Sequence, residues 1–206
     1  MLRSCRHPLL LLLAVIASGC ASTQIVNVWQ DPKFSGPPLK RIMVIGVTKQ
    51  AGIRRTFEDE FVRALDANGV KGVASYLFIP EDGEVPKERL TEAVKESGVA
   101  GVIITRMVKV EVQTQVYAAP YPAPYPGPSP YFGFYGYYSS AWIGYYDPPQ
   151  FYAYDVVTSE TNLFDAASDA LIWSGTTQTY ASRNVRKGAR DFANVIVKAL
   201  VAKQII

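Results

Sequence analysis

The chain has 206 residues, with 21 basic and 18 acidic side chains, two cysteines and one histidine. This balance is close to neutral and provides no strongly basic surface for nucleic acid. Cys5 and His7 both precede Cys20, so a chain that begins at Cys20 contains no imidazole and a single thiol. That excludes an internal disulfide, a Ser-His-Asp or Cys-His mechanism and an ordinary zinc or haem site, and we expect no cofactor.

Residues 1–19 are typical of a bacterial secretory signal. Arg3 and Arg6 come before an apolar run, Leu9 to Ala17, that is too short to span a membrane. The run ends in small residues, and the stretch Ala17-Ser18-Gly19-Cys20 resembles a lipobox, although leucine is commoner at its first position. The resemblance implies cleavage before Cys20 and lipid attachment to its thiol. The alternative is an ordinary signal peptide that ends near a cysteine.

The residues after the signal predict a short tether at 20–24 and a single α/β domain at 25–206. In its first half we expect strands at 25–29, 41–47, 73–79 and 102–104, and helices at 53–68 and 86–97. The run 41–47 is continuously apolar, so we expect it to be the central strand. The alternation of strands and helices predicts a βαβαβ unit with a parallel sheet.

Up to Ile104 the apolar residues of this segment are consecutive, whereas beyond Thr105 every second residue is apolar. Val108, Val110, Val112 and Val116 alternate with polar residues, which predicts a long, half-exposed strand. Its expected antiparallel partners are residues 152–164 and 170–181, joined by a turn at 165–169, and residues 191–206 form a closing helix. The predicted fold class is therefore α/β, a mixed sheet with a βαβαβ parallel part, an antiparallel hairpin extension and a C-terminal helix.

Several charged residues are expected on the surface. Arg54-Arg55 opens the helix at 53–68, and Glu58-Asp59-Glu60 follows one turn later, so we interpret both groups as solvent-exposed, with an ion pair between Arg54 and Glu58. Glu160 is placed on the polar face of the hairpin. The side chains expected in the core include Phe61 and Trp173.

Residues 118–150 differ in composition from the rest of the chain. The stretch from Tyr117 to Tyr154 contains eleven of the 13 tyrosines, eight of the 14 prolines and one charged residue, Asp147. Prolines at alternate positions from 120 to 130 exclude a helix there, so we expect a low-complexity loop. Three interpretations are open: a loop without a specific partner, a surface that stacks on a glycan or an envelope protein, and an aromatic tip at the membrane interface. The candidate binding surface consists of Tyr131, Phe132, Phe134, Tyr135 and Trp142.

The lipobox, the order of elements and the hairpin together resemble a group of uncharacterised bacterial envelope lipoproteins, many with a Tyr/Gly/Pro-rich insertion. The hairpin runs from Glu160-Thr161-Asn162-Leu163-Phe164-Asp165 to Leu171-Ile172-Trp173-Ser174-Gly175. The core is also similar to the fold shared by the TolB N-terminal domain, the lipoprotein LpoB and the curli secretion lipoprotein. This resemblance implies binding or assembly work in the periplasm rather than catalysis, and it supplies no active-site residues.

These observations predict a lipid-anchored periplasmic binding or scaffolding protein of the cell envelope that is not an enzyme. Ala21, not Asp, follows Cys20, which by the sorting rule of enteric lipoproteins favours the outer membrane, with the domain facing the periplasm. One alternative is a subunit of an oligomeric outer-membrane secretion pore, with residues 107–117 as a membrane strand. The other is a carboxylate-dependent envelope enzyme that uses the acids at 81–84, which a solvated turn explains as well.

Overall fold

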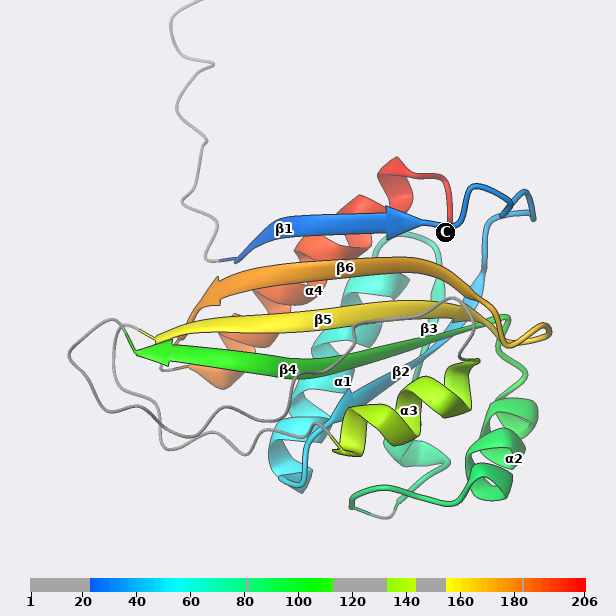
Figure 1. Ribbon diagram of the computed structural model, residues 1–206, viewed down its shortest axis with the longest axis horizontal. Helices are drawn as coiled ribbons and strands as arrows, with labels where there is room; N and C mark the ends of the chain where they lie inside the picture. The colour runs from blue at the N-terminus through cyan, green and yellow to red at the C-terminus, as the bar shows by residue number, and fades with distance from the viewer. Residues whose placement is uncertain (1–22, 81, 113–132, 144–154, 183) are drawn as a thin grey trace, which may run out of the picture.

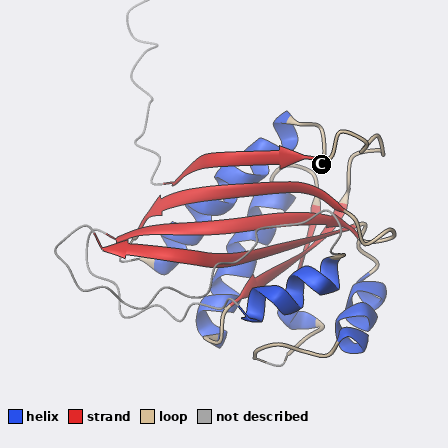
Figure 2. Cartoon of the chain, in the orientation of Figure 1, coloured by secondary structure: helices blue, strands red, loops and turns tan. Residues whose placement is uncertain are grey.

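The computed structural model describes residues 23–80, 82–112, 133–143, 155–182 and 184–206. The described chain forms one six-stranded sheet with helices on both faces (Figures 1 and 2). In chain order the elements of the first half are β1 (Thr23–Gln30), β2 (Arg41–Val47), α1 (Ala51–Asp66), β3 (Lys71–Ala74), the 3-10 helix η1 (Ser75–Leu77), α2 (Lys87–Ser97) and β4 (Gly101–Val112). The second half contains α3 (Phe134–Ile143), β5 (Asp155–Asp165), β6 (Leu171–Tyr180) and α4 (Val185–Ala202).

The sheet is mixed, and its strand order is β1-β6-β5-β4-β2-β3. β2 pairs in parallel with both β3 and β4, whereas β4, β5, β6 and β1 pair antiparallel in succession. The predicted fold class is confirmed, including the hairpin from β5 to β6 and the C-terminal helix. The prediction that residues 41–47 form the central strand is wrong, because β5 and β4 occupy the middle of the sheet and β2 lies next to the edge strand β3.

One face of the sheet is covered by α1 and α4 (Figure 1). Their apolar residues recur at helical spacing and face the sheet, where they bury the side chains expected in the core. Phe61 and Trp173 are both fully buried, which confirms that prediction. The ring of Phe57 lies 5.7 Å from that of Phe61 and 5.6 Å from that of Phe192, so an aromatic cluster joins the two helices to each other.

The opposite face carries α2 and α3, and α3 corrects the expectation of one continuous loop at 118–150. Phe134, Tyr137, Tyr138 and Ala141 are buried against β4 and β5 in the second half of the core. Residues 134–143 contain no proline, so nothing in the backbone prevents a helix there. The proline-rich residues 118–130 lie outside the described residues.

Several element boundaries differ from the predictions. β3 ends at Ala74 and is followed by η1, because the Ser75 hydroxyl and the Tyr76 amide both donate hydrogen bonds to the carboxylate of Glu58. α4 begins six residues before the predicted start, where the side chain of Asn184 accepts a hydrogen bond from the Lys187 amide at 3.0 Å and caps the helix. The segments predicted as separate strands around Thr105 form the single strand β4, whose pairing with β5 shifts register between Met107 and Lys109.

Candidate binding pocket between α1, α4 and the sheet

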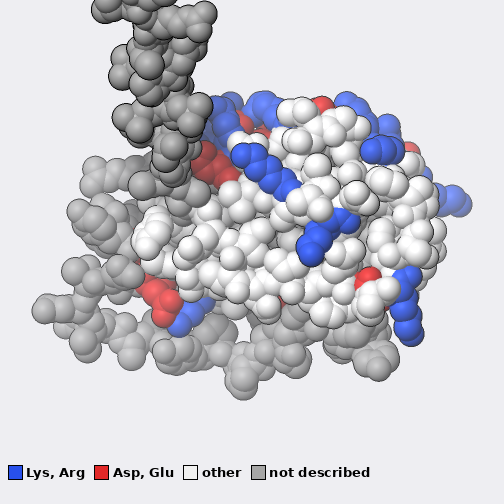
Figure 3. All heavy atoms as spheres, turned by 90° about the horizontal axis from the view of Figure 1, so that it is seen from above, with Lys and Arg blue, Asp and Glu red and all other residues white. Residues whose placement is uncertain are grey.

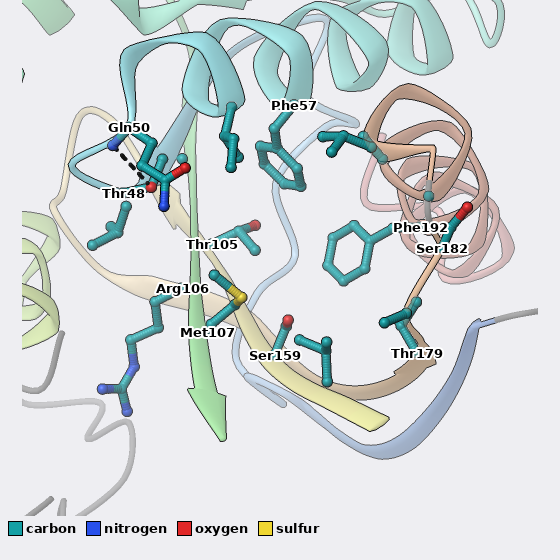
Figure 4. Close-up of a pocket in the computed structure, with 18 residues that line it drawn as sticks. Thr48, Gln50, Phe57, Thr105, Arg106, Met107, Ser159, Thr179, Ser182 and Phe192 are labelled. Carbon is teal, nitrogen blue, oxygen red and sulfur yellow. Dashed lines mark hydrogen bonds between the residues drawn. The ribbon is translucent and has the colours of Figure 1, made fainter. Parts of the chain in front are cut away.

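A pocket of about 200 Å³ lies between the first turns of α1 and α4 and the sheet (Figure 4). Its floor is the sheet face that α1 and α4 cover, and its walls carry the rings of Phe57 and Phe192. Thr48 and Gln50, which follow β2, stand at one side. The floor and the remaining wall include Thr105, Met107, Val157, Ser159, Thr179, Ser182, Val185 and Ala189.

Most polar side chains of this pocket carry hydroxyls, with the amide of Gln50 beside them, and several of the hydroxyls already have partners within the protein. Thr105 Oγ1 lies 3.0 Å from Thr161 Oγ1, and Thr179 Oγ1 lies 3.0 Å from Thr23 Oγ1. The side chain of Arg106 points away from the pocket in Figure 4, and its Nε lies 3.5 Å from the carboxylate of Glu160. The pocket therefore has an apolar interior with a few hydroxyls.

The lining and the size of the pocket suit an apolar ligand. No Asp, Glu, His, Lys or Cys is found among the described residues that line the pocket, so its hydroxyls have no adjacent general base. An engineered cavity of about 150 Å³ lined by apolar side chains binds benzene. A pocket of about 200 Å³ is thus large enough for one ring or a short alkyl segment.

The pocket lies at the end of the sheet where β1 begins. Thr23, the first residue of β1, pairs with the pocket-lining residue Thr179. Cys20 lies outside the described residues, but only two residues, Ala21 and Ser22, separate it from Thr23 in the sequence. The three Cα–Cα steps from Cys20 to Thr23 span at most about 11 Å. Any lipid on Cys20 is therefore attached close to the pocket.

Buried charges beside the pocket correct the expectation of a solvated start to α1. Arg54 is 5% exposed and Glu58 is fully buried, although the predicted pair between them is confirmed at 3.0 Å. Arg54 also donates to the Ser75 hydroxyl at 2.8 Å, and the Gly46 amide donates to Glu58 at 3.1 Å. Burial raises the pKa of Glu58, and the charge of Arg54 opposes that rise only in part. The network holds the end of β2, the start of α1 and η1 together.

Two more carboxylates predicted to be exposed are buried. Glu60 is 1% exposed and binds Arg63 and Arg190, which joins α1 to α4. Burial pushes the pKa of Glu60 up, but the hydrogen bond from Arg190 and the charges of both arginines outweigh it and hold the pKa below its usual value. Glu160 is 6% exposed and accepts hydrogen bonds from Tyr137 at 2.5 Å and from Asn162 at 3.0 Å. Both carboxylates have a structural role, since each one binds side chains of a second helix or strand.

The residues predicted as an aromatic binding surface do not line this pocket. Tyr131 and Phe132 lie outside the described residues, as does Cys20. Phe134 is only 7% exposed, so it belongs to the core and is not available to a partner. Tyr135 and Trp142 are half-buried, with Lys87 Nζ 5.7 Å from the ring of Tyr135 and the ring of Trp142 6.1 Å from that of Tyr138. Among the described members of this set, Tyr135 and Trp142 are the two that keep part of their surface exposed.

Sequence reasoning missed the pocket, because its residues come from four separate stretches, 46–57, 105–107, 157–159 and 179–192, and share no motif. It also proposed acids at 81–84 as a possible catalytic group. Glu81 lies outside the described residues, and Asp82 and Glu84 are exposed in a turn. Within the described ranges, no three metal-binding side chains gather, and no helix is both long and apolar enough to cross a bilayer.

No known protein family and no curated protein matches this sequence. Among solved structures, the chain is similar to the PelC dodecamer from Paraburkholderia phytofirmans, with 18% identity and a TM-score of 0.43 over 84% of this chain and 94% of that chain. A variant of the same dodecamer gives 18% identity and a TM-score of 0.42 with the same coverage. Lipoprotein GNA1162 from Neisseria meningitidis gives 12% identity and a TM-score of 0.38, over 80% of this chain and 95% of that chain. Likeness at this level does not establish a shared function.

Proposed function

We propose that this chain is a lipid-anchored binding or scaffolding protein of the bacterial cell envelope, attached through Cys20 to the outer membrane with its domain in the periplasm. The observation that carries the proposal is the short link between Cys20 and β1, whose first residue pairs with a residue of the pocket. A domain on such a link stays at the membrane surface. The pocket between α1 and α4 then lies where apolar groups of envelope molecules are concentrated.

The proposed activity is binding without chemistry. The pocket provides an apolar interior and hydroxyls, which suit an amphipathic molecule with a ring or short alkyl segment and a neutral polar group. Partner contact through the insertion at 118–150 remains part of the proposal, with an envelope protein or a glycan as the partner. Of the aromatic residues predicted for that contact, Tyr135 and Trp142 are described and partly exposed.

Lipid attachment is tested by labelling cells with radioactive palmitate and separating membranes from soluble periplasm. The native chain is expected to carry label and stay with the outer membrane, because several acyl chains bury far more CH₂ groups than a single marginal anchor. Cys20→Ser is expected to lose the label. Cys5→Ser is the matched control, since Cys5 lies within the predicted signal. A labelled, membrane-bound Cys20→Ser chain would refute the anchor.

Binding in the pocket is tested on the released Cys20→Ser chain with the apolar fluorescent probe ANS. Ala189→Leu places a larger side chain in the pocket and is expected to weaken probe binding at least tenfold. Ala202→Leu is the control, because it makes the same change at an exposed position of the same helix. Equal probe affinity in the two variants would show that the pocket is not the binding site.

A further inference from the structure

The two edges of the sheet differ in length and in charge. β3, at one edge, has four residues, begins with Lys71 and turns directly into η1. β1, at the other edge, has eight residues, Thr-Gln-Ile-Val-Asn-Val-Trp-Gln, and none of them is charged. Edge strands are normally kept from pairing by shortness, lysine, proline, a bulge or a covering element. β3 has the first two of these protections. β1 has neither of the two, and its one irregularity is a register shift between Ile25 and Asn27 in its pairing with β6.

The outer side of β1 is open in the described structure. β1 pairs only with β6, so the N–H and C=O groups that point away from β6 meet no strand among the described residues. Three large apolar side chains on β1 are exposed: Val26 at 49%, Val28 at 41% and Trp29 at 37%. Figure 3 looks down on this edge, and much of that face is uncharged, with single lysine or arginine side chains across its middle and more of them toward its margins.

We propose that β1 pairs antiparallel with β1 of a second copy of this chain, about a two-fold axis perpendicular to the sheet. The result is one continuous sheet through both copies. An antiparallel strand pair is self-complementary, because each outward N–H faces an outward C=O of the partner. A two-fold axis also places like residues near each other, so a charged edge would repel its own copy. The uncharged sequence of β1 meets that condition.

The geometry of the anchor agrees with a second copy as the partner, although the pairing does not depend on lipidation. In an antiparallel pair, the two Thr23 residues lie at opposite ends of the paired strands. Eight residues of strand extend about 26 Å. When the two-fold axis is normal to the membrane, the short links from Cys20 to Thr23 in both copies reach the same bilayer. Pairing therefore leaves both copies anchored side by side.

Cysteine crosslinking tests the pairing in the full-length protein in its own membranes. A two-fold axis passes beside one residue of the strand, which then faces its own copy at a Cα distance of about 4.5–5.5 Å. Val26 and Asn27 are nearest the middle of β1, so Val26→Cys or Asn27→Cys is expected to give a disulfide-linked dimer. Gln24→Cys is the matched control on the same strand. Its copy lies more than about 10 Å away, beyond the reach of a disulfide.

The expected result is at least a fivefold higher dimer yield from one of the two central cysteines than from Gln24→Cys. The unmodified chain shows the background, since its only cysteines are Cys5 and Cys20. Equal yields from central and terminal positions would overturn the proposal. So would a crosslink between β1 and Lys71→Cys, because that pairing joins unlike edges and extends without closing.

A second substitution separates edge pairing from random collision. Val28→Lys, added to the crosslinking variant, puts like charges near the axis and is expected to lower the dimer yield at least tenfold. The position is 41% exposed, so the fold accommodates lysine, which an unchanged melting temperature verifies. Leu77→Lys is the control, since Leu77 is 66% exposed and follows the other edge strand. Equal dimer yields for the two lysine variants would also overturn the proposal.

Discussion

The two faces of the sheet are covered by helices of different kinds. α1 and α4 each carry apolar residues on one face and charged residues elsewhere, and they meet the sheet through Phe57, Phe61 and Phe192. α3 has no charged residue, and its tyrosines and small residues are distributed around all sides of the helix. α1 and α4 can therefore be recognised in the sequence by the helical spacing of their apolar residues, whereas α3 is recognised only by what it packs against. The contrast shows that composition alone does not separate a loop from a core helix.

Removing α3 is the strongest test of that contrast. Replacing residues 118–150 with a short Gly/Ser link is expected to abolish cooperative unfolding, because it takes Phe134, Tyr137 and Tyr138 out of the core. Each fully buried large side chain contributes about 1.5–3 kcal/mol. Three of them approach a typical total stability of about 5–15 kcal/mol. Urea unfolding followed by tryptophan fluorescence measures the change.

A second replacement distinguishes loss of the helix from loss of the segment before it. Exchanging only residues 118–130 for Gly/Ser of equal length keeps α3 intact. The length of the connection is unchanged, so the entropy of closing it changes little. This variant is expected to unfold cooperatively. A cooperative transition at the native midpoint in the full replacement would show that α3 does not contribute to the core. The comparison of α3 with α1 and α4 as core helices would then fail.

On the other face, Phe61→Ala is expected to lower the free energy of unfolding by about 3–5 kcal/mol. Phe61 is fully buried, and its ring contacts those of Phe57 and Phe192, so the cavity removes contacts from both helices. Denaturant unfolding gives the value. Leu77→Ala is the control at a 66% exposed position, where a change within about 0.5 kcal/mol is expected. Similar losses in both variants would mean that α1 and α4 are not packed as described.

The buried pair in α1 is the next test. Arg54→Met leaves Glu58 without its charge partner, and breaking one side of a buried pair costs about 3–5 kcal/mol. Arg55→Met is the matched control, because Arg55 is the neighbouring residue and is exposed. Stability at a series of pH values separates lost charge pairing from lost packing.

The pH dependence follows from the direction of the shift. The pKa of Glu58 in the folded protein lies above its ordinary value of 4.5, and burial is the largest cause. Removing Arg54 raises that pKa further, so the folded state of the variant takes up a proton more readily than the unfolded state. The contribution of Glu58 to stability is then greatest at low pH and falls as pH rises through the folded pKa. We expect Arg54→Met to be less destabilising at pH 5 than at pH 8, and an equal loss at both would contradict a buried carboxylate.

The sequence predicts most of the sheet because its strands have strong local signals. β2 is a continuous apolar run, and the turn between β5 and β6 is marked by Asp165 and Asp169. The burial of Arg54 and Glu58 was also readable, because with Phe61 and Leu65 they share one stripe at helical spacing. Because Arg54 and Glu58 are charged, they were assigned to the surface, although their positions on the helix indicate burial.

The pocket and α3 depend on contacts that a single sequence does not encode locally. The pocket forms where four separate stretches of the chain meet, and the order of their strands in the sheet is fixed only by pairing between distant strands. α3 is held by partners far along the chain. The Phe134 amide donates to the carboxylate of Asp169, and the hydroxyl of Tyr137 donates to Glu160. Neither partner can be chosen from the sequence around the helix.

The smallest expected effect tests one such distant contact of α3. The Tyr138 hydroxyl accepts a hydrogen bond from the Val85 amide at 3.0 Å and donates one to the Gly83 carbonyl at 3.2 Å. Burial raises the pKa of Tyr138, so the hydroxyl remains protonated at neutral pH and both bonds persist. Tyr138→Phe keeps the ring and leaves the Val85 amide without its acceptor, which costs about 1–3 kcal/mol. Tyr180→Phe is the control, since Tyr180 is 58% exposed.

Amide exchange at Val85 is expected to become faster in Tyr138→Phe, and by more than exchange in β2, because the substitution acts where α3 holds the segment before α2. Unchanged exchange at Val85 would show that α3 packs on the sheet without fixing that segment, and the two faces would then differ in what their helices hold as well as in how they are recognised.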